Sequence, residues 1–188
     1  AGGNLKEPVT ESTKKAARCF YALEQNRADK KRYPAVNPID SYSKYLEYPE
    51  FADYIAKTIN DKWIPKVLDL KTRMQRGKEI AEQINILGDD GVPVDYHIVF
   101  WKSEVIDFVL LQQDAFDEVD AVTSLERQEA ILNLVTEICE TDFQFDHFEE
   151  CVDFFRKLIN LCKQMNYSEF KSEQYNDFVS QIKAMLAA

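Results

Sequence analysis

The segment Gln112–Phe116, which reads Gln-Gln-Asp-Ala-Phe, brings two amides, a carboxylate and a large aromatic ring together. It follows an apolar helical stretch and precedes a helix predicted to begin at Thr123 or Ser124, so it should be a linker. A large ring in a linker needs something to cover it, because burial of apolar surface is favourable. One candidate is a planar, hydrogen-bonding ligand. The other is the protein's own helical bundle, where phenylalanines usually lie, and from the residues alone both interpretations stay open.

A second aromatic ring is attached to a stiff stretch of backbone. Tyr33 directly precedes Pro34, and Pro38 follows shortly after. Two prolines this close exclude a regular helix, and the residue before a proline favours an extended conformation. The ring of Tyr33 is therefore expected to project from a rigid path. That arrangement suits stacking on a ligand, and it suits fixing a loop to a core equally well.

The chain lacks the residues that bind nucleotide phosphates in a P-loop. Such a loop reads Gly-x-x-x-x-Gly-Lys-Ser/Thr, and none of the five glycines, at positions 2, 3, 77, 88 and 91, is followed by Lys-Ser or Lys-Thr in that frame. The phosphate-binding Lys, the Mg²⁺-binding hydroxyl and the Walker-B acid are missing with it. The sequence also has no nucleophile elbow or dinucleotide fingerprint. No catalytic residue is predicted, and the chain alone is expected not to hydrolyse ATP.

Composition is that of an acidic globular protein. The 188 residues are 45% hydrophobic and 30% charged, with a net charge of −10. The excess of carboxylates argues against a nucleic-acid partner and against docking on an anionic membrane. No apolar run approaches the ~20 residues that span a bilayer, and no signal peptide is evident. The start without Met suggests part of a longer protein, and a cytoplasmic location without membrane insertion is expected.

The cysteines and histidines do not suggest a metal site. The chain has four cysteines and two histidines, and no Cys-x-x-Cys pair: Cys19, Cys139, Cys151, Cys162, His97 and His147. This spacing is unlike that of a zinc site, so no metal ligand is predicted. Reduced, mostly buried thiols are the expected state of these cysteines. His97 is expected at a helix surface or edge.

Apolar periodicity predicts an all-α fold. Helices are predicted over residues 10–28, 53–60, 61–87, 95–112, 124–138, 145–165 and 168–186. Asp95 is expected to cap the fourth of these helices, and Thr123–Glu126 to form a capping box for the fifth. Gly77 is expected to weaken the longest helix by about 1 kcal/mol relative to Ala.

Two ordered sets of residues match one known family. The first set comprises Gly2–Asn4, Glu7–Thr10, Phe20–Glu24, Arg32–Asn37 and Ser41–Ser43; the second comprises Leu111–Asp117, Val119, Asp120, Ser124 and Gln128. Both sets resemble the catalytic A subunit of V-type and archaeal-type rotary ATPases and ATP synthases, whose second motif reads Leu-Gln-Gln-Asn-Ala-Phe-Asp. The resemblance covers about residues 2–140.

The resemblance implies an architecture and a site. Residues 1–44 would be the tail of an α/β nucleotide-binding domain, and residues 45–188 a C-terminal helical bundle domain. Tyr33 and Phe116 would flank an adenine ring, with Gln113, Asp114 and Ala115 along the same edge. Two positions depart from the family pattern. The family Phe is Tyr33 here, which keeps the ring, and the family Asn is Asp114, whose ionised side chain cannot donate a hydrogen bond.

The activity that the resemblance implies belongs to a full-length subunit. It is ATP synthesis or hydrolysis coupled to proton or sodium transport, with ATP or ADP and Mg²⁺ bound in the parent protein and no nucleotide held tightly by this piece. Such A subunits alternate with B subunits in an A3B3 ring around a central shaft, peripheral to the membrane. The loops 88–94 and 116–123 are the candidates to face the shaft. The alternative, a free-standing acidic helical interaction module, would explain the composition but not the two ordered motifs.

Overall fold

The computed structural model describes residues 7–187, and the chain divides into two compact units, one ending at Pro65 and one starting at Lys66. This division lies within the first turn of a long helix. The predicted boundary between residues 44 and 45 concerns the domains of a longer parent protein. That boundary stays a prediction, and each compact unit is described by itself below.

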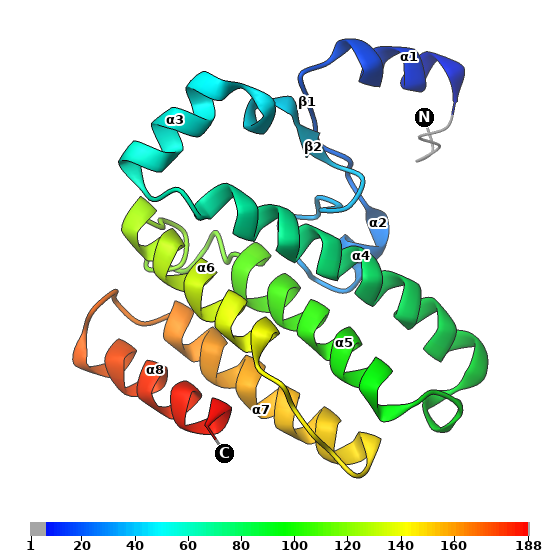
Figure 1. Cartoon of the computed structure of the whole chain (residues 1–188), viewed down its shortest axis with the longest axis vertical. Coiled ribbons are helices and arrows are strands. Elements are labelled where there is room, and N and C mark those ends of the chain that lie inside the picture. Colours follow the sequence, from blue (N-terminus) through cyan, green and yellow to red (C-terminus); the bar gives the residue numbers. More distant parts are fainter. Residues whose placement is uncertain (1–6, 188) are drawn as a thin grey trace. The chain divides into compact units, whose positions relative to one another are not determined.

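The first unit contains short elements joined by extended backbone (Figure 1). They are α1 (Pro8–Ala16), β1 (Cys19–Phe20), α2 (Gln25–Asp29), β2 (Tyr42–Ser43), the 3-10 helix η1 (Lys44–Glu47) and α3 (Pro49–Thr58). Proline occupies the first turn of both α1 and α3, where its missing N–H costs nothing. The two strands pair antiparallel, with Cys19 opposite Ser43.

The single helix predicted over residues 10–28 is wrong. The backbone becomes extended at Ala17 and stays irregular until α2. Its polar groups are used by a later segment of the same unit: Ala22 O accepts from Asn37 N at 2.7 Å, and Glu24 N donates to Ala35 O at 2.9 Å. This non-local pairing outweighs the local helix propensity, which is only a weak preference.

The second unit is a helical bundle, and the predicted all-α class is confirmed. Its elements are α4 (Trp63–Leu87), η2 (Asp89–Gly91), α5 (Val94–Val105), the π-helix η3 (Ile106–Leu111), α6 (Leu125–Glu140), α7 (Phe148–Asn166) and α8 (Glu173–Leu186). Helix α7 packs against both α5 and α8 (Figure 1). Every long helix of this unit was expected from periodicity, but α8 begins at Glu173 and not at the predicted Ser168, and the helix predicted over 95–112 becomes a π-helix after Val105.

Two predicted helix caps are wrong. Helix α5 begins at Val94, one residue before Asp95, so Asp95 lies in the first turn. Helix α6 does start where expected, but its cap is Ser124, whose hydroxyl accepts from Arg127 N at 3.2 Å. The predicted capping box is shifted out of register by one residue. Glu126 pairs instead with Lys171.

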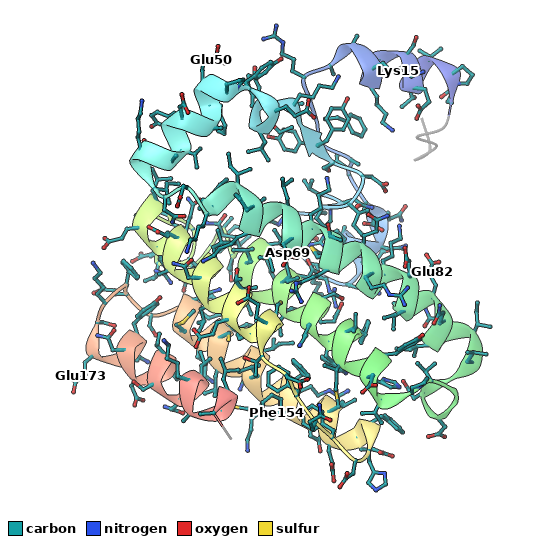
Figure 2. The ribbon with its side chains drawn as sticks, in the orientation of Figure 1. Lys15, Glu50, Asp69, Glu82, Phe154 and Glu173 are labelled. Carbon is teal, nitrogen blue, oxygen red and sulfur yellow. The ribbon has the colours of Figure 1, made fainter. Side chains whose placement is uncertain are left out.

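Aromatic side chains fill one end of this bundle. Phe155 is fully buried, and its ring centroid lies 5.1 Å from that of Phe143 and 6.5 Å from that of Trp101. Phe154, labelled in Figure 2, joins the same cluster at 5.5 Å from Phe155. The phenylalanine stripe of α7 is therefore core, as its spacing predicts. Acidic side chains such as Glu82 and Glu173 stand in solvent around it (Figure 2).

His97 is buried, which corrects the expectation that it lies at a surface or edge. Its side chain is 1% exposed, and its ring stacks on Phe148 at 5.3 Å. The ring nitrogen Nε2 lies 3.0 Å from Asp89 O, so the buried imidazole has a hydrogen-bond partner. Helical periodicity could not reveal this position, because Phe148 comes from α7, which packs against α5.

Gly77 marks a close contact between α4 and α5. An ideal Cβ at this position would lie 2.0 Å from Ser103 Oγ and 2.3 Å from Ser103 Cβ. Ser103 is itself buried, and its hydroxyl donates to Phe100 O at 2.7 Å. The glycine, expected from the sequence to be a weak point of α4, is instead a requirement of packing.

We expect Gly77→Ala to lower the free energy of unfolding by about 1–3 kcal/mol, the usual cost of overpacking. In a helix without such a contact, replacing Gly by Ala would instead raise the free energy of unfolding by about 1 kcal/mol. Urea unfolding measures the change. The double variant Gly77→Ala/Ser103→Gly removes the clashing atoms and should recover part of the loss. A Gly77→Ala protein more stable than the wild type would contradict the close contact.

Three of the four thiols lie in the core, as expected. Cys139, Cys151 and Cys162 are buried, and all four cysteines are free. Burial raises the pKa of the Cys162 thiol from 9.0 to about 12, and that of Cys139 to about 11. An unfolded chain releases these protons at lower pH than the folded chain does. Below pH 9 the thiols are protonated in both states, so their burial contributes its full share to the free energy of unfolding. As pH rises from 9 toward the folded pKa values, only the unfolded state loses these protons, and that contribution is lost.

The stability advantage of the wild type over Cys162→Ala should shrink by about 1.4 kcal/mol per pH unit above pH 9. The methyl group that replaces the thiol in the variant does not ionise, so only the wild type shows this pH dependence. Urea unfolding of both proteins at pH 8, 9.5 and 10.5 makes the comparison. Equal differences in unfolding free energy at all three pH values would show that this thiol is not held protonated by burial.

Candidate functional site

The loop between η3 and α6 is held in shape by its own aspartates. Asp114 Oδ1 accepts from Phe116 N at 2.9 Å. Asp117 Oδ1 accepts from Val119 N at 2.9 Å and from Asp120 N at 2.8 Å. Such side-chain to backbone hydrogen bonds replace those of regular structure and favour turns. The acidic linker is therefore an ordered loop with a defined path.

Phe116 stands at the exposed tip of this loop. Its side chain is 99% exposed, so the interpretation that it packs into its own bundle is wrong. Its backbone N–H is the group that Asp114 holds. Val122, further along the same loop, is 78% exposed. An ordered loop thus presents a large ring to solvent, where a ligand or a partner could cover it.

The other predicted base-binding residues flank this ring with part of their hydrogen-bonding capacity already in use. Gln113 Nε2 donates to Asp120 O at 2.7 Å, which fixes the direction of the amide. Asp114 acts as an acceptor toward the loop backbone, in agreement with its inability to donate when ionised. Ala115 is exposed and adjoins Phe116. Hydrogen bonds from this edge to a ligand would come from backbone groups or the Gln113 oxygen.

Tyr33 lies in the first unit, on a hairpin-like return of the chain. The bridge between Leu23 and Val36 closes the return, and Arg32 N donates to Arg27 O at 2.8 Å near its turn. The Tyr33–Pro34 peptide bond is cis, and the Tyr33 side chain is 52% exposed. Its ring is thus available on a defined backbone, as expected. Phe116 belongs to the second unit, so the apposition of the two rings around a base stays a prediction.

Two residues that the sequence did not single out anchor the base of the loop. Arg127 is buried, and its Nη2 donates to the carbonyl of Asn166 at the end of α7, with Met165 O at 3.5 Å. Asn166 Nδ2 in turn donates to Val109 O of η3 at 2.8 Å. One signal was available: Arg127 lies in the first turn of α6, where the helix dipole disfavours a cation. A partner from outside α6 could have been inferred from it.

Carboxylates dominate the electrostatics behind the loop. Desolvation by burial raises the pKa of Asp120, while the hydrogen bond from Asp114 N and the charge of Arg127 oppose the rise. Burial also raises the pKa of Tyr167, and the charges of Asp114 and Asp120 add to this effect. The cavity between these groups is only about 10 Å³. That volume matches one water molecule, so a purine could bind only on the open side of the loop.

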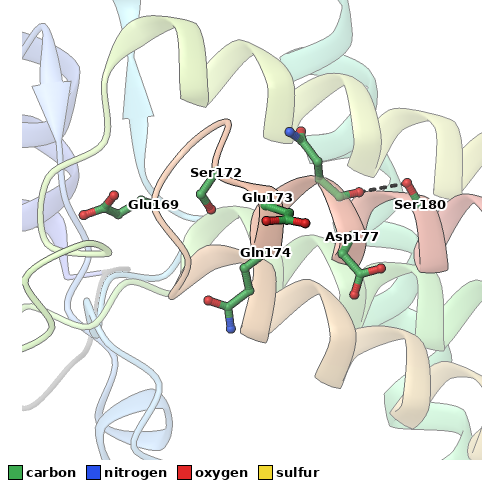
Figure 3. A pocket seen from close by; sticks show the side chains of 7 residues that line it. Glu169, Ser172, Glu173, Gln174, Asp177 and Ser180 are labelled. Atoms are coloured by element: carbon green, nitrogen blue, oxygen red, sulfur yellow. Dashed lines mark hydrogen bonds between the residues drawn. The ribbon is translucent and has the colours of Figure 1, made fainter.

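A wide hollow lies along the start of α8, away from these residues in the sequence (Figure 3). It measures about 800 Å³ and is lined by Glu169, Ser172, Glu173, Gln174, Asn176, Asp177 and Ser180. Figure 3 shows the carboxylates of Glu173 and Asp177 on the same helix. Three carboxylates and no cation line it, so it is unsuited to a phosphate tail.

Residues 7–187 contain neither a metal-binding cluster nor a membrane-spanning helix. No group of three or more His, Cys, Asp or Glu side chains is placed to hold a metal ion in this part of the chain. Among the same residues, no helix has both the length and the apolar character needed to cross a bilayer.

The chain is similar in sequence to the alpha chains of V-type ATP synthases. No family model matches it. The V-type ATP synthase alpha chain of Borrelia duttonii is 35% identical over 99% of this chain. The alpha chains of Protochlamydia amoebophila and Treponema denticola are both 34% identical, over 99% and 100% of it. The chain spans about 30% of the length of these relatives.

A solved structure shares the fold. An ATP synthase subunit described as unique, NeqB from Nanoarcheaum equitans, aligns with 75% of this chain and 33% of its own, with a TM-score of 0.53 and 17% identity. At that identity the likeness concerns the fold alone. The relationship rests on the sequence similarity. The aligned region extends beyond the two motifs and covers 99–100% of this chain. The chain is therefore a homologue of the V-type ATP synthase alpha chains over about 30% of their length, and the resemblance inferred from its two ordered motifs is confirmed.

Proposed function

We propose that the chain is the C-terminal part of the catalytic alpha (A) subunit of a V-type ATP synthase or ATPase, and that it supplies one side of the adenine pocket. The parent enzyme would couple ATP synthesis or hydrolysis to proton or sodium transport. The observation that carries the proposal is the similarity of 99% of this chain to about 30% of an alpha chain, joined to an ordered loop that exposes the ring of Phe116. A free-standing interaction module could use the exposed ring, but it would not account for the similarity to the alpha chains.

The proposed base-binding residues are those that the resemblance implies. Tyr33 and Phe116 would each supply an aromatic face for an adenine base, and Gln113, Asp114 and Ala115 would supply the polar edge beside Phe116. The exposure of both rings supports this assignment, because each has a free aromatic face. Aromatic stacking on a base contributes about 1–3 kcal/mol. The site would therefore select and orient the base, while affinity and chemistry come from elsewhere in the parent.

The phosphates and Mg²⁺ would be bound by a P-loop outside this chain. The sequence contains no such loop, and the acidic hollow along α8 could not replace it. The full-length subunit would hold ATP or ADP with Mg²⁺, and this chain would hold neither tightly. The two ends of the nucleotide need different partners: the phosphates need cationic groups, and the base needs an aromatic surface on which to stack.

The helical unit would transmit the nucleotide state to the rest of the machine. Alpha subunits would alternate with B subunits in an A3B3 ring, and their helical domains would surround a central shaft on the cytoplasmic side of the membrane. Of the two candidate loops, 88–94 adjoins Ile86 and Leu87, whose side chains are 81% and 61% exposed. Loop 116–123 exposes Phe116 and Val122 to a similar degree, so apolar exposure supports both loops as candidates for the shaft contact.

The chain alone should bind ATP with a dissociation constant weaker than 1 mM. Stacking of about 1–3 kcal/mol falls well short of the ~8 kcal/mol that a micromolar complex requires. Isothermal titration calorimetry with Mg-ATP at millimolar concentration tests this. Micromolar binding would show that this part of the chain contains a phosphate site after all.

In the full-length parent complex, Phe116→Ala should raise the KM for ATP by at least about fivefold, because the base loses its stacking partner. The turnover number should change less, since no reacting group is touched. Phe116→Tyr, which keeps the ring, is the matched control and should stay within about twofold of the wild type. Wild-type steady-state kinetics in the Phe116→Ala complex would refute the adenine-pocket assignment.

A further inference from the structure

We propose that Asp120 is a positioning residue for the base-binding loop: it fixes the conformation in which Gln113, Asp114 and Phe116 meet the ligand. The link to a base rests on the proposed function, whereas the effect on loop conformation does not. Asp120 makes several hydrogen bonds within the loop. Asp120 uses three separate groups, its carboxylate, its carbonyl and its N–H, and each holds a different part of the loop.

Each of these contacts fixes a specific residue. The Asp120 Oδ2 atom accepts from Asp114 N at 2.6 Å, and the Asp120 carbonyl accepts from Gln113 Nε2 at 2.7 Å. The Asp120 N–H donates to Asp117 Oδ1 at 2.8 Å. Asp114, so oriented, holds Phe116 N at 2.9 Å. A continuous set of hydrogen bonds therefore runs from Asp120 to the backbone of the exposed ring.

Burial strengthens the hydrogen bonds that the Asp120 carboxylate accepts. The side chain is only 9% exposed, at the inner face of the loop. A carboxylate accepts hydrogen bonds more strongly than a neutral group, and more so where water is excluded. Arg127, itself anchored on the end of α7, supplies a nearby positive charge. The positive charge of Arg127 favours the ionised form of Asp120, which holds the loop backbone.

The position of Asp120 separates it from the base-contact residues. Phe116 is exposed at the tip, whereas Asp120 lies behind it beside a cavity of about 10 Å³, too small for any base. Asp120 would act through Asp114 and Gln113 without touching the ligand. When only a fraction of molecules has the competent loop, the apparent affinity falls by that fraction. Loss of Asp120 should therefore resemble a partial loss of Phe116.

The first experiment is independent of nucleotide. Amide hydrogen exchange of the chain by NMR should show protection of Asp114 N–H in the wild type, and an exchange rate at least about tenfold faster in Asp120→Ala, because the acceptor is gone. Asp120→Asn retains an acceptor oxygen and should give an intermediate rate. The control Asp153→Ala removes an exposed carboxylate of α7 and should leave the loop protected. Wild-type exchange of Asp114 N–H in both Asp120 variants would overturn the proposal.

The second experiment uses ATP kinetics of the full-length complex. Asp120→Ala should raise KM by about fivefold, with turnover close to that of the wild type and Asp120→Asn in between. In the double variant with Phe116→Ala, the two effects on KM should be clearly less than multiplicative, because the loop has no ring left to position. A purely structural defect would lower the yield of assembled complex and act multiplicatively.

The outcomes distinguish this proposal from the proposed function. Unchanged KM in Asp120→Ala, together with raised KM in Phe116→Ala, would overturn the positioning role while the adenine pocket stands. Unchanged KM in Phe116→Ala would refute the adenine pocket, and the exchange rates would still decide whether Asp120 fixes the loop. Full multiplicativity in the double variant would likewise overturn the positioning role.

Discussion

The second unit depends on one recurring interaction, the covering of helix C-terminal carbonyls by cations from other helices. The last carbonyls of an α-helix have no partner within the helix and carry its negative pole. At the end of α7, Arg127 of α6 donates to the carbonyl of Asn166. At the end of α6, Arg73 of α4 donates to Cys139 O at 3.1 Å, and Lys102 of α5 donates to Thr141 O at 2.7 Å. Desolvation lowers the pKa of Lys102, so this contact is made at some cost. Each contact satisfies a carbonyl at a helix end and fixes that end against another helix.

The same interaction determines where the candidate site lies. Asn166, whose carbonyl receives Arg127, uses its own amide to cover Val109 O in the π-helix that precedes the loop. The two ends of the loop are thus attached to the same point of the bundle, the C-terminus of α7. Aspartates then shape the loop between these ends. This rigidity matters for function because an exposed ring on a disordered loop would lose most of its stacking energy to ordering on binding. The irregular π-helical turn fits this role, since such turns often occur at functional sites.

The relationship to the alpha chains gives this arrangement a context. Relatives about three times longer contain a region that is 34–35% identical to this chain over 99% of its length. A ring presented toward solvent is costly for an isolated module but reasonable for a piece that completes a larger site. The acidic net charge agrees with this view, because this part would need no cation of its own if phosphates are bound elsewhere. The buried thiols, with raised pKa values, are poor nucleophiles at neutral pH.

The sequence by itself determined the helices of the second unit, the core stripe of α7, the buried thiols and the family relationship. These features depend on local periodicity and on the order of motifs, which a single chain displays directly. Only the tertiary structure decided that Gly77 must be a glycine, that His97 is buried, that residues 10–28 do not form one helix, and that Phe116 is exposed. It also revealed Arg127 and Asn166, whose partners lie 39 and 57 residues away. Phe116 is exposed because local aspartate hydrogen bonds shape its loop. In the other cases the deciding contact comes from another segment of the chain, and such contacts outweigh local propensities without leaving a periodic trace in the sequence.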